Sequence, residues 1–215
     1  TCTILDKISD SKQRIWYIQK TIENGWSRNV LSIQIQSDLY ARDGKSINNF
    51  KSTLPAAQSD LAQSIIKDPY NLEFLDIQGK IHERELEGKL IDHIRNFLLE
   101  LGQGFAFIGN QYHIELEGED YYLDLLFYHV KLKCYVVIEL KTGKFKPEHA
   151  GKMNFYLNLM DRQVKDSSDN PTIGLILCED KKGITVEYAI EGINKPMGIS
   201  QFKLTEKLPE QLKQY

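Results

Sequence analysis

The sequence predicts an α/β (α+β) fold: a mixed β-sheet flanked by helices and preceded by a small helical segment. Two observations predict it. From about residue 82 onward, helical and strand patterns follow one another in the order α-β-β-β-α-β-β. The segment at 172–178 is apolar throughout, which is typical of a strand buried on both faces. A chain of 215 residues has room for two units, and we expect a helical segment with connector at 1–79 and the main domain at 80–215.

Two helices are expected near the N-terminus. Ser9 or Ser11 caps the first, which ends at Gly25. Ser27 caps the second, which ends near Gly44. Such a pair is either a helix-turn-helix or a simple packing unit, and no recognition helix stands out.

The remaining elements follow in order along the chain. Residues 45–79 are rich in polar residues and contain two prolines, which predicts a connector with one short helix at about 56–67. The main domain is then expected to contain a helix at about 82–101, strands at 105–115, 121–129 and 134–140, a helix from Pro147 to about Arg162, and strands at 172–178 and 184–190.

Composition and cysteine usage narrow the class of protein. With 41% hydrophobic and 27% charged residues and a net charge of −3, the chain has the composition of an ordinary globular protein. No apolar run approaches the roughly 18 residues of a membrane span, and no secretory signal is recognisable. Cys2, Cys134 and Cys178 have unrelated spacings, which argues against a disulfide framework or a zinc site. We therefore expect a cytoplasmic protein with no membrane partner.

Charged side chains interrupt two of the apolar strands. Because side chains alternate along a strand, Glu139 and Lys141 share one face at the end of the strand at 134–140. Asp124 lies among leucines on the preceding strand, where an unpaired carboxylate would be costly. The connection at 130–133 is short, so we expect the two strands to be antiparallel neighbours and the two carboxylates to converge.

Two converging carboxylates and a lysine suit the hydrolysis of a phosphodiester. Carboxylate oxygens are ligands that Mg²⁺ prefers, and the bound ion lowers the pKa of its water. A lysine beside the ion orients the attacking water and stabilises the transition state. An acid two residues before a lysine is common by chance, so a structural ion pair is the alternative interpretation of this D…ExK pattern.

The helix at 82–101 carries an acidic residue on its apolar face. At about 100° per residue, the apolar stripe from Leu86 to Leu101 covers an arc of about 140°, and Glu87 lies inside it. Glu83 also falls inside the arc, at the start of the helix, where water is close. A core-facing glutamate requires a partner, so Glu87 is either a site residue or a buried glutamate paired with a lysine.

Positive charge gathers around Glu139. Between Lys131 and Lys152 the chain has six lysines and two acids. In a chain with a net negative charge, these lysines are either a solvated face or a nucleic-acid footprint. A phosphate backbone that passes the site would meet Lys144, Lys146 and Lys152, which we take as candidate nucleic-acid-binding residues.

Together these residues resemble a known family. The segments that carry the resemblance are FLLELGQGFAFIGNQYHIE, YYLDLLFYHVKLKCYVVIELKTGKFKPEHAGKMNFYLNLMD, NPTIGLILCEDK and VEYAIEGINKPMGIS. Over roughly residues 82–202 they resemble the YhcG-like family of bacterial PD-(D/E)XK nucleases. The stretches WYIQKTIENGWSRNVLSIQIQSDLY and DPYNLEFL resemble the end of the helical domain that precedes the nuclease domain in that family.

The resemblance implies a restriction-endonuclease-like α-β-β-β-α-β core. It implies that Asp124 and Glu139 ligate a metal ion and that Lys141 is the catalytic lysine. Glu87 matches the glutamate of the first core helix, so it joins the predicted catalytic and metal-binding residues. Lys152 occupies a position where glutamine is more typical.

We therefore expect a Mg²⁺-dependent nuclease that acts on DNA in processing, restriction or repair, with Mn²⁺ as a substitute and RNA left open as a substrate. Because many nucleases pair two active sites to cut both strands, a homodimer is a further expectation. The alternatives are a nuclease-like module that binds nucleic acid or protein with little turnover, and a helical interaction protein. The latter does not explain the acidic residues on the strands.

Overall fold

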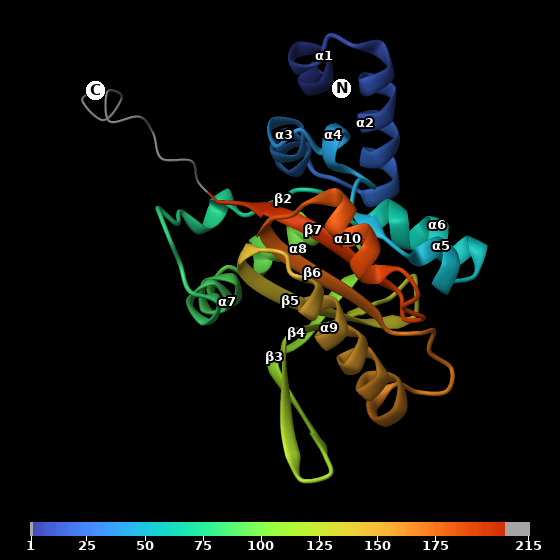
Figure 1. Ribbon diagram of the computed structural model, residues 1–215. Helices are drawn as coiled ribbons and strands as arrows, with labels where there is room; N and C mark the ends of the chain where they lie inside the picture. The colour runs from blue at the N-terminus through green and yellow to red at the C-terminus, as the bar shows by residue number, and fades with distance from the viewer. Residues whose placement is uncertain (1, 205–215) are drawn as a thin grey trace.

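The computed structural model describes residues 2–204; residue 1 and residues 205–215, which end the predicted main domain, lie outside the described residues. Four helices form a lobe on one side of the sheet domain (Figure 1). They are α1 (Cys2–Lys7), α2 (Ser11–Asn24), α3 (Arg28–Gln36) and α4 (Leu39–Arg42). Within residues 2–204, no helix combines the length and the apolar character that crossing a membrane requires.

The N-terminal lobe has a small core of its own, formed by Ile4, Ile8, Tyr17, Leu31 and Leu39. Ser27 caps α3, as predicted. The cap of α2 is Asp10 rather than Ser9 or Ser11, because the Asp10 carboxylate accepts a backbone hydrogen bond from the first turn at 2.8 Å. Gly25 ends α2 with φ at 60°, a left-handed conformation that favours glycine.

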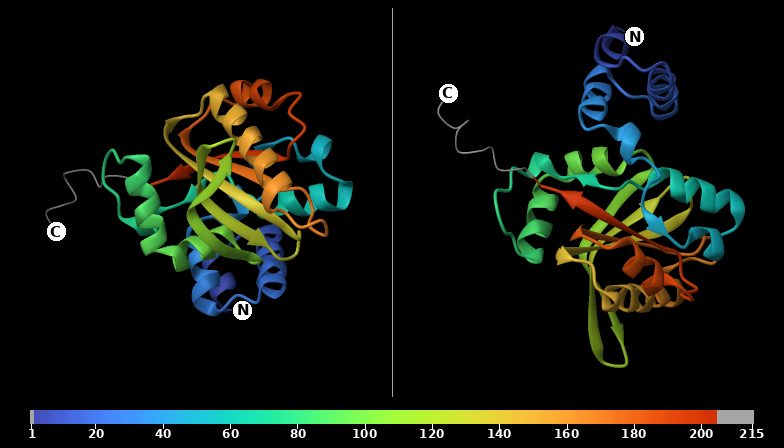
Figure 2. Two further views of the ribbon diagram at one scale, coloured as in Figure 1. Left: turned by 90° about the horizontal axis from the view of Figure 1, so that it is seen from below. Right: turned by 45° about the horizontal axis from the view of Figure 1, so that its top comes forward.

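The sheet domain contains the predicted mixed sheet. Its strands are β1 (Ile47–Asn48), β2 (Tyr70–Asn71), β3 (Phe105–Leu116), β4 (Glu119–His129), β5 (Cys134–Lys144), β6 (Ile173–Asp180) and β7 (Met197–Lys203). Among the described residues the order is β1-β7-β6-β5-β4-β3, with β2 paired to β7. β3, β4 and β5 are antiparallel, whereas β5, β6 and β7 are parallel. The β3–β4 hairpin extends past the sheet, opposite the N-terminal lobe (Figures 1 and 2).

Helices cover both faces of the sheet. One apolar core lies under α5 (Phe50–Thr53), α6 (Ala56–Ile65), α7 (Glu83–Asp92) and α8 (Ile94–Leu101). The other lies under α9 (Pro147–Leu159) and α10 (Gly183–Ile190). A 3₁₀ turn (Glu73–Leu75) and a π-helical turn (Met160–Val164) complete the elements of the described chain. On β5, Val136, Ile138 and Leu140 face the first core and Val137 the second, so the predicted alternation is confirmed.

The strand predicted at 184–190 is wrong: this segment is helix α10, and the last strand is β7. Parallel neighbours such as β6 and β7 require a crossover connection, which is commonly a helix. Val186 and Ile190, one helical turn apart, are buried, whereas Ile184 and Tyr188 are exposed. In a strand these four residues would all lie on one face and would be buried or exposed together. Their burial pattern therefore fits a helix.

The single helix predicted at about 82–101 is two helices. His93, with φ at −111° and ψ at 29°, separates α7 from α8. Neither glycine nor proline marks this break in the sequence. Leu90 before it and Phe97 after it are fully buried, so both helices keep the predicted apolar face on the sheet.

The polar segment at 45–79 contains the predicted short helix, α6, and also contributes to the sheet. β1 pairs antiparallel with β7, and β2 pairs parallel with it. Phe50 and Ile66 pack in the core beneath α7 and α8. The division of the chain between residues 79 and 80 stays a prediction.

Candidate active site

The site forms where β4 and β5 separate. Their antiparallel ladder ends at Leu125 and Ile138, and the next residues are Asp124 and Glu139. At this point, side-chain carboxylates accept the backbone hydrogen bonds that carbonyl oxygens accept elsewhere in the ladder. The backbone N–H of Leu140 donates to Asp124 Oδ2 at 2.9 Å, and the N–H of Asp124 donates to Glu139 Oε1 at 3.4 Å. The structure thus brings the two carboxylates together where the β4–β5 ladder ends, in the middle of both strands.

The Lys141 ammonium lies between these carboxylates. Its Nζ is 3.7 Å from Glu139 Oε2 and 4.0 Å from Asp124 Oδ2. It also donates to Leu140 O at 2.6 Å and to Glu83 Oε2 at 3.1 Å. Oxygen atoms therefore surround one buried positive charge, as they would a hard metal cation.

The two carboxylates repel each other in a poorly solvated place. The Glu139 side chain is 3% exposed and that of Asp124 is 18% exposed. Burial, and then the charge of Glu139, raise the pKa of Asp124 to about 6, although the Leu140 N–H and the Lys141 ammonium act in the opposite direction. The site therefore has more negative charge than its burial favours, and a further cation would stabilise it.

Lys152, from α9, supplies a second ammonium. Its Nζ lies 2.9 Å from Glu139 Oε2 and 4.9 Å from the centre of the Tyr156 ring. Lys152 and Tyr156 are four residues apart, which places both on one face of α9. Although burial acts in the opposite direction, the charge and hydrogen bond of Glu139 raise the pKa of Lys152.

Glu87 lies near this group, with partners of its own. It is 5% exposed on α7, as the helical geometry predicts. Its oxygens accept hydrogen bonds from Asn110 Nδ2 at 2.9 Å and Gln111 Nε2 at 2.5 Å. Gln111 has φ at 45°, a strained left-handed conformation for a residue other than glycine. Of the two alternatives, the buried glutamate paired with a lysine is not observed, because two amides are the partners of Glu87.

An open cavity of about 480 Å³ connects Glu87 with Asp124. It is lined by Glu83, Arg84, Glu87, Gln111, Tyr122 and Asp124. Sequence reasoning did not include Tyr122 or Gln111 in the site. Tyr122 precedes Asp124 by two residues, so strand periodicity places it on the same face. No sequence signal indicates the left-handed turn that presents Gln111.

Comparison with known proteins decides the family. The sequence profile of the YhcG PDDEXK nuclease domain matches residues 63–215. The chain belongs to this nuclease family. The DUF1016 N-terminal domain profile matches residues 1–42. The curated protein "Putative nuclease YhcG" from Escherichia coli (strain K12) is 35% identical over 209 residues, which are 95% of this chain and 55% of that protein. The chain thus spans about half the length of this relative.

Two solved structures align with part of this chain. A repair endonuclease from Pyrococcus abyssi aligns with a TM-score of 0.36 and 14% identity, over 61% of this chain and 50% of its own. A complex of EndoMS with double-stranded DNA aligns with a TM-score of 0.40 and 14% identity, over 62% of this chain and 48% of its own.

Two of the predicted nucleic-acid-binding lysines lie outside the carboxylate group. Lys144 is 75% exposed, with Nζ 4.0 Å from Asp180 Oδ2. Lys146 is 65% exposed, with Nζ 3.6 Å from Glu148 Oε1. Both lie on the segment that links the end of β5 to the start of α9. Both side chains are largely exposed and follow the D…ExK motif closely in the chain.

The donor set of the nuclease domain fits a Mg²⁺ ion with Asp124 and Glu139 as ligands. Mg²⁺ commonly uses one or two carboxylates and completes its shell with waters and substrate phosphates. Within residues 2–204, no three acidic, histidine or cysteine side chains are placed to hold one ion together. The structure therefore does not bring Glu87 into the pair, and its role as a ligand stays a prediction.

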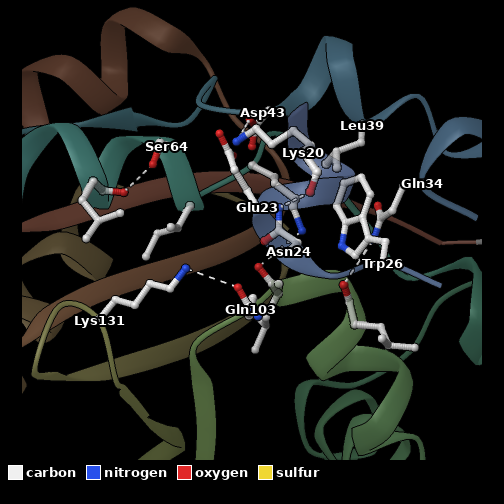
Figure 3. Close-up of a pocket in the computed structure, with 16 residues that line it drawn as sticks. Lys20, Glu23, Asn24, Trp26, Gln34, Leu39, Asp43, Ser64, Gln103 and Lys131 are labelled. Atoms are coloured by element: carbon white, nitrogen blue, oxygen red, sulfur yellow. Dashed lines mark hydrogen bonds and ion pairs between the residues drawn. The ribbon is translucent and has the colours of Figure 1, made fainter. Parts of the chain in front are cut away.

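A second cavity, of about 260 Å³, lies between the N-terminal lobe and the nuclease domain (Figure 3). Lys20 at its wall is paired with Asp43 at 2.9 Å, and Lys131 donates to Gln103 at 3.2 Å. The cavity is lined by parts of α2, α6 and α8 rather than by the D…ExK strands. Asp124 lines the larger cavity and not this one.

Proposed function

We propose that the chain hydrolyses phosphodiester bonds in DNA with a divalent ion, Mg²⁺ or Mn²⁺, bound by Asp124 and Glu139. One observation carries the proposal. In a domain of the nuclease family, the buried Glu139 carboxylate and the partly buried Asp124 carboxylate share the Lys141 ammonium, and Asp124 lines an open cavity. A simple ion pair needs one carboxylate, whereas here burial and the charge of Glu139 raise the pKa of a second one, Asp124, which favours a functional site.

The residues of the chain divide the chemical tasks. The bound ion would supply charge for the phosphate oxygens and an acidified water. Lys141 is held by Leu140 O and Glu83, which fixes its ammonium beside the carboxylates and close to the position of a reacting phosphate. There it would donate to a non-bridging oxygen as negative charge develops.

Glu87 acts as a positioning residue in this proposal. Two amides fix both of its oxygens on the wall of the cavity that Asp124 also lines. A carboxylate fixed in this way accepts hydrogen bonds in a defined direction, and so orients water that enters the cavity. Glu87→Gln should therefore lower kcat more than it raises KM, since the substrate phosphate binds elsewhere.

DNA is the substrate that we propose, with the backbone passing Lys144, Lys146 and Lys152. Lys152 contacts Glu139, and Lys144 and Lys146 follow Lys141 closely in the chain, so their local positive charge would offset the net charge of −3. Free, buried Cys134 and Cys178 are consistent with action in the reducing cytoplasm. Cleavage of both strands would require two copies, so we also propose a homodimer on DNA.

A cleavage assay tests the proposal directly. The chain is incubated with duplex, branched and single-stranded DNA, and with RNA, in Mg²⁺, Mn²⁺ or EDTA. We expect cleavage of at least one DNA form that requires the ion and falls at least about 100-fold in Lys141→Ala. Lys195→Ala is the matched control, because Lys195 is ion-paired to Asp161 at 2.5 Å outside the cavity.

The assay also separates the alternative function. Metal-dependent DNA binding without cleavage would indicate a nuclease-like binding module with little turnover. Cleavage that Lys141→Ala retains in full would overturn the assignment of the site. Cleavage of RNA alone would keep the chemistry and correct the substrate.

A further inference from the structure

Lys152 blocks one of the two proposed metal ligands. Its ammonium makes the 2.9 Å contact to Glu139 Oε2, whereas Lys141 lies 3.7 Å from the same oxygen. The other oxygen, Oε1, is in contact with the backbone N–H of Asp124. In this state Lys152 is therefore the principal partner of the Glu139 oxygen that a metal ion would need.

Lys141 and Lys152 differ in how easily their ammonium groups can move away from Glu139. The Lys141 side chain is 11% exposed, and the carbonyl of Leu140 holds its ammonium. The Lys152 side chain is 44% exposed, and its ammonium lies near the face of Tyr156 at the edge of the site. A long, unbranched side chain at a solvent boundary moves its charge into water easily. Lys152 can thus leave Glu139, whereas Lys141 is fixed.

We propose that Lys152 is an internal counterion that competes with the divalent ion for Glu139 and, once displaced, binds a phosphate of the DNA. The inference rests on the proposed function, since it takes Asp124 and Glu139 as the metal ligands. Without DNA, the ion must displace the ammonium and so binds more weakly. With DNA, the phosphate receives the ammonium, and the ion binds more tightly.

A coupling of metal and DNA binding follows. If DNA increases the affinity for the ion by some factor, the ion must increase the affinity for DNA by the same factor. This competition would favour binding of the metal ion where a phosphate backbone is present. It would give a role to Lys152, which occupies a position where glutamine is more typical.

A structural ion pair makes the opposite prediction. If Lys152 only anchored α9 to the sheet, its removal would loosen the site and leave the affinity for metal unchanged or weaker. If Lys152 competes with the ion, its removal tightens metal binding. The direction of the change in Kd therefore separates the two roles.

The experiment measures Mn²⁺ binding to the whole chain without DNA, by the electron paramagnetic resonance signal of free Mn²⁺. We expect Lys152→Gln to lower the Kd about tenfold, equivalent to about 1.4 kcal/mol. Lys152→Arg, which keeps the charge, should bind like the wild type. Lys20→Gln is a matched control, because Lys20 pairs with Asp43 at the same 2.9 Å and also lies over an aromatic ring, that of Trp16.

A second titration adds a short phosphorothioate duplex that resists hydrolysis. The wild type should bind Mn²⁺ several-fold more tightly with the duplex than without it, and Lys152→Gln should lose most of this gain. Melting curves report whether each variant is folded, and Lys152→Met replaces Lys152→Gln if the latter is not.

The outcomes separate the inference from the function on which it rests. A wild-type chain that binds no Mn²⁺, with or without the duplex, overturns the proposed metal site and this inference with it. If the wild type binds Mn²⁺, Asp124→Asn does not, and Lys152→Gln binds no more tightly than the wild type, the inference alone is overturned. Tighter binding in Lys152→Gln but not in Lys20→Gln supports it.

Discussion

Two buried clusters of charge in this chain differ in how completely the protein satisfies them. At the junction with the N-terminal lobe, Arg42 and Glu100 are each 8% exposed and lie 2.5 Å apart. Arg42 also donates to Ser37 O at 2.8 Å and Pro69 O at 2.9 Å. Glu100 also accepts the backbone N–H of Asn71 at 2.8 Å. Every charge in this pair is balanced by the protein itself.

The charges of the candidate active site are compensated less completely. Asp124 and Glu139 face each other, and Lys141 is shared between them rather than paired with one. Burial, and then the charge of Glu139, raise the pKa of Asp124, so its negative charge is held at a cost. The comparison teaches that burial of charge does not by itself mark function. A fully paired cluster holds two parts of the fold together, whereas an incompletely balanced one beside a cavity is available for a ligand.

The largest effect on stability is expected from a substitution in the Arg42–Glu100 pair. Glu100→Gln would leave the Arg42 guanidinium buried without its counterion, and loss of one partner of a buried pair costs about 3–5 kcal/mol. The midpoint of thermal unfolding should fall by about 10 °C. Glu179→Gln, at an exposed position on β6, is the control and should change stability by less than about 0.5 kcal/mol. A similar small change in Glu100→Gln would show that the junction pair does not hold the fold.

A substitution in the candidate active site is expected to raise stability rather than lower it. Asp124→Asn removes the repelled charge and keeps an oxygen for the Leu140 N–H, so it should stabilise the metal-free chain by up to about 3 kcal/mol at pH 7.5. Because the folded pKa of Asp124 is raised from 3.8 to about 6, the wild type is relatively most stable below pH 4 and loses this stability as pH rises through 6. Urea unfolding of both proteins at pH 4 and pH 7.5 measures the difference, which should nearly vanish at pH 4. A difference that is equal at both pH values would contradict the argument.

Metal should offset the same repulsion. An ion that binds only the folded chain stabilises it by RT ln(1 + [L]/Kd), about 1.4 kcal/mol at ten times the Kd. For a chain of 215 residues this raises the unfolding midpoint by about 4 °C. Melting curves with Mg²⁺, Mn²⁺ or EDTA measure the shift, which Asp124→Asn should abolish and Glu100→Gln should retain. The same shift in Asp124→Asn would place the ion elsewhere.

The geometry at the centre of the candidate active site was predictable because it follows from local periodicity. The alternation along β5 places Glu139 and Lys141 on one face, and the short turn after β4 makes the two strands neighbours. The burial of Glu87 follows from the helical repeat in the same way. Periodicity failed in α10, where alternating apolar residues indicated a strand but the parallel β6 and β7 required a helical crossover.

The rest of the site depends on contacts between elements that are distant in sequence. Lys152 reaches Glu139 because α9 packs across the sheet, and no spacing in the sequence reports this contact. Gln111 reaches Glu87 because β3 adopts a left-handed conformation at that residue. The junction pair joins α4 to α8 over 58 positions, and nothing near either residue indicates the other. Such pairs require the fold before they can be recognised.

The smallest effect on stability is expected from charges that the fold leaves in water. Lys144 and Lys146 are 75% and 65% exposed, with carboxylates 4.0 Å and 3.6 Å away, so replacing both with alanine should change stability by less than about 1 kcal/mol. Their effect should appear in DNA binding, where each phosphate contact changes the slope of log K against log[salt] by about 0.9. We expect the double variant to flatten this slope by about one to two and to weaken binding to all sequences alike.

Fluorescence anisotropy with a labelled duplex at several salt concentrations measures the slope. Lys181→Ala, at a lysine paired with Asp68 away from the cavity, should keep the wild-type slope. A double variant with that same slope would mean that Lys144 and Lys146 only solvate the loop, and that other charges meet the phosphates.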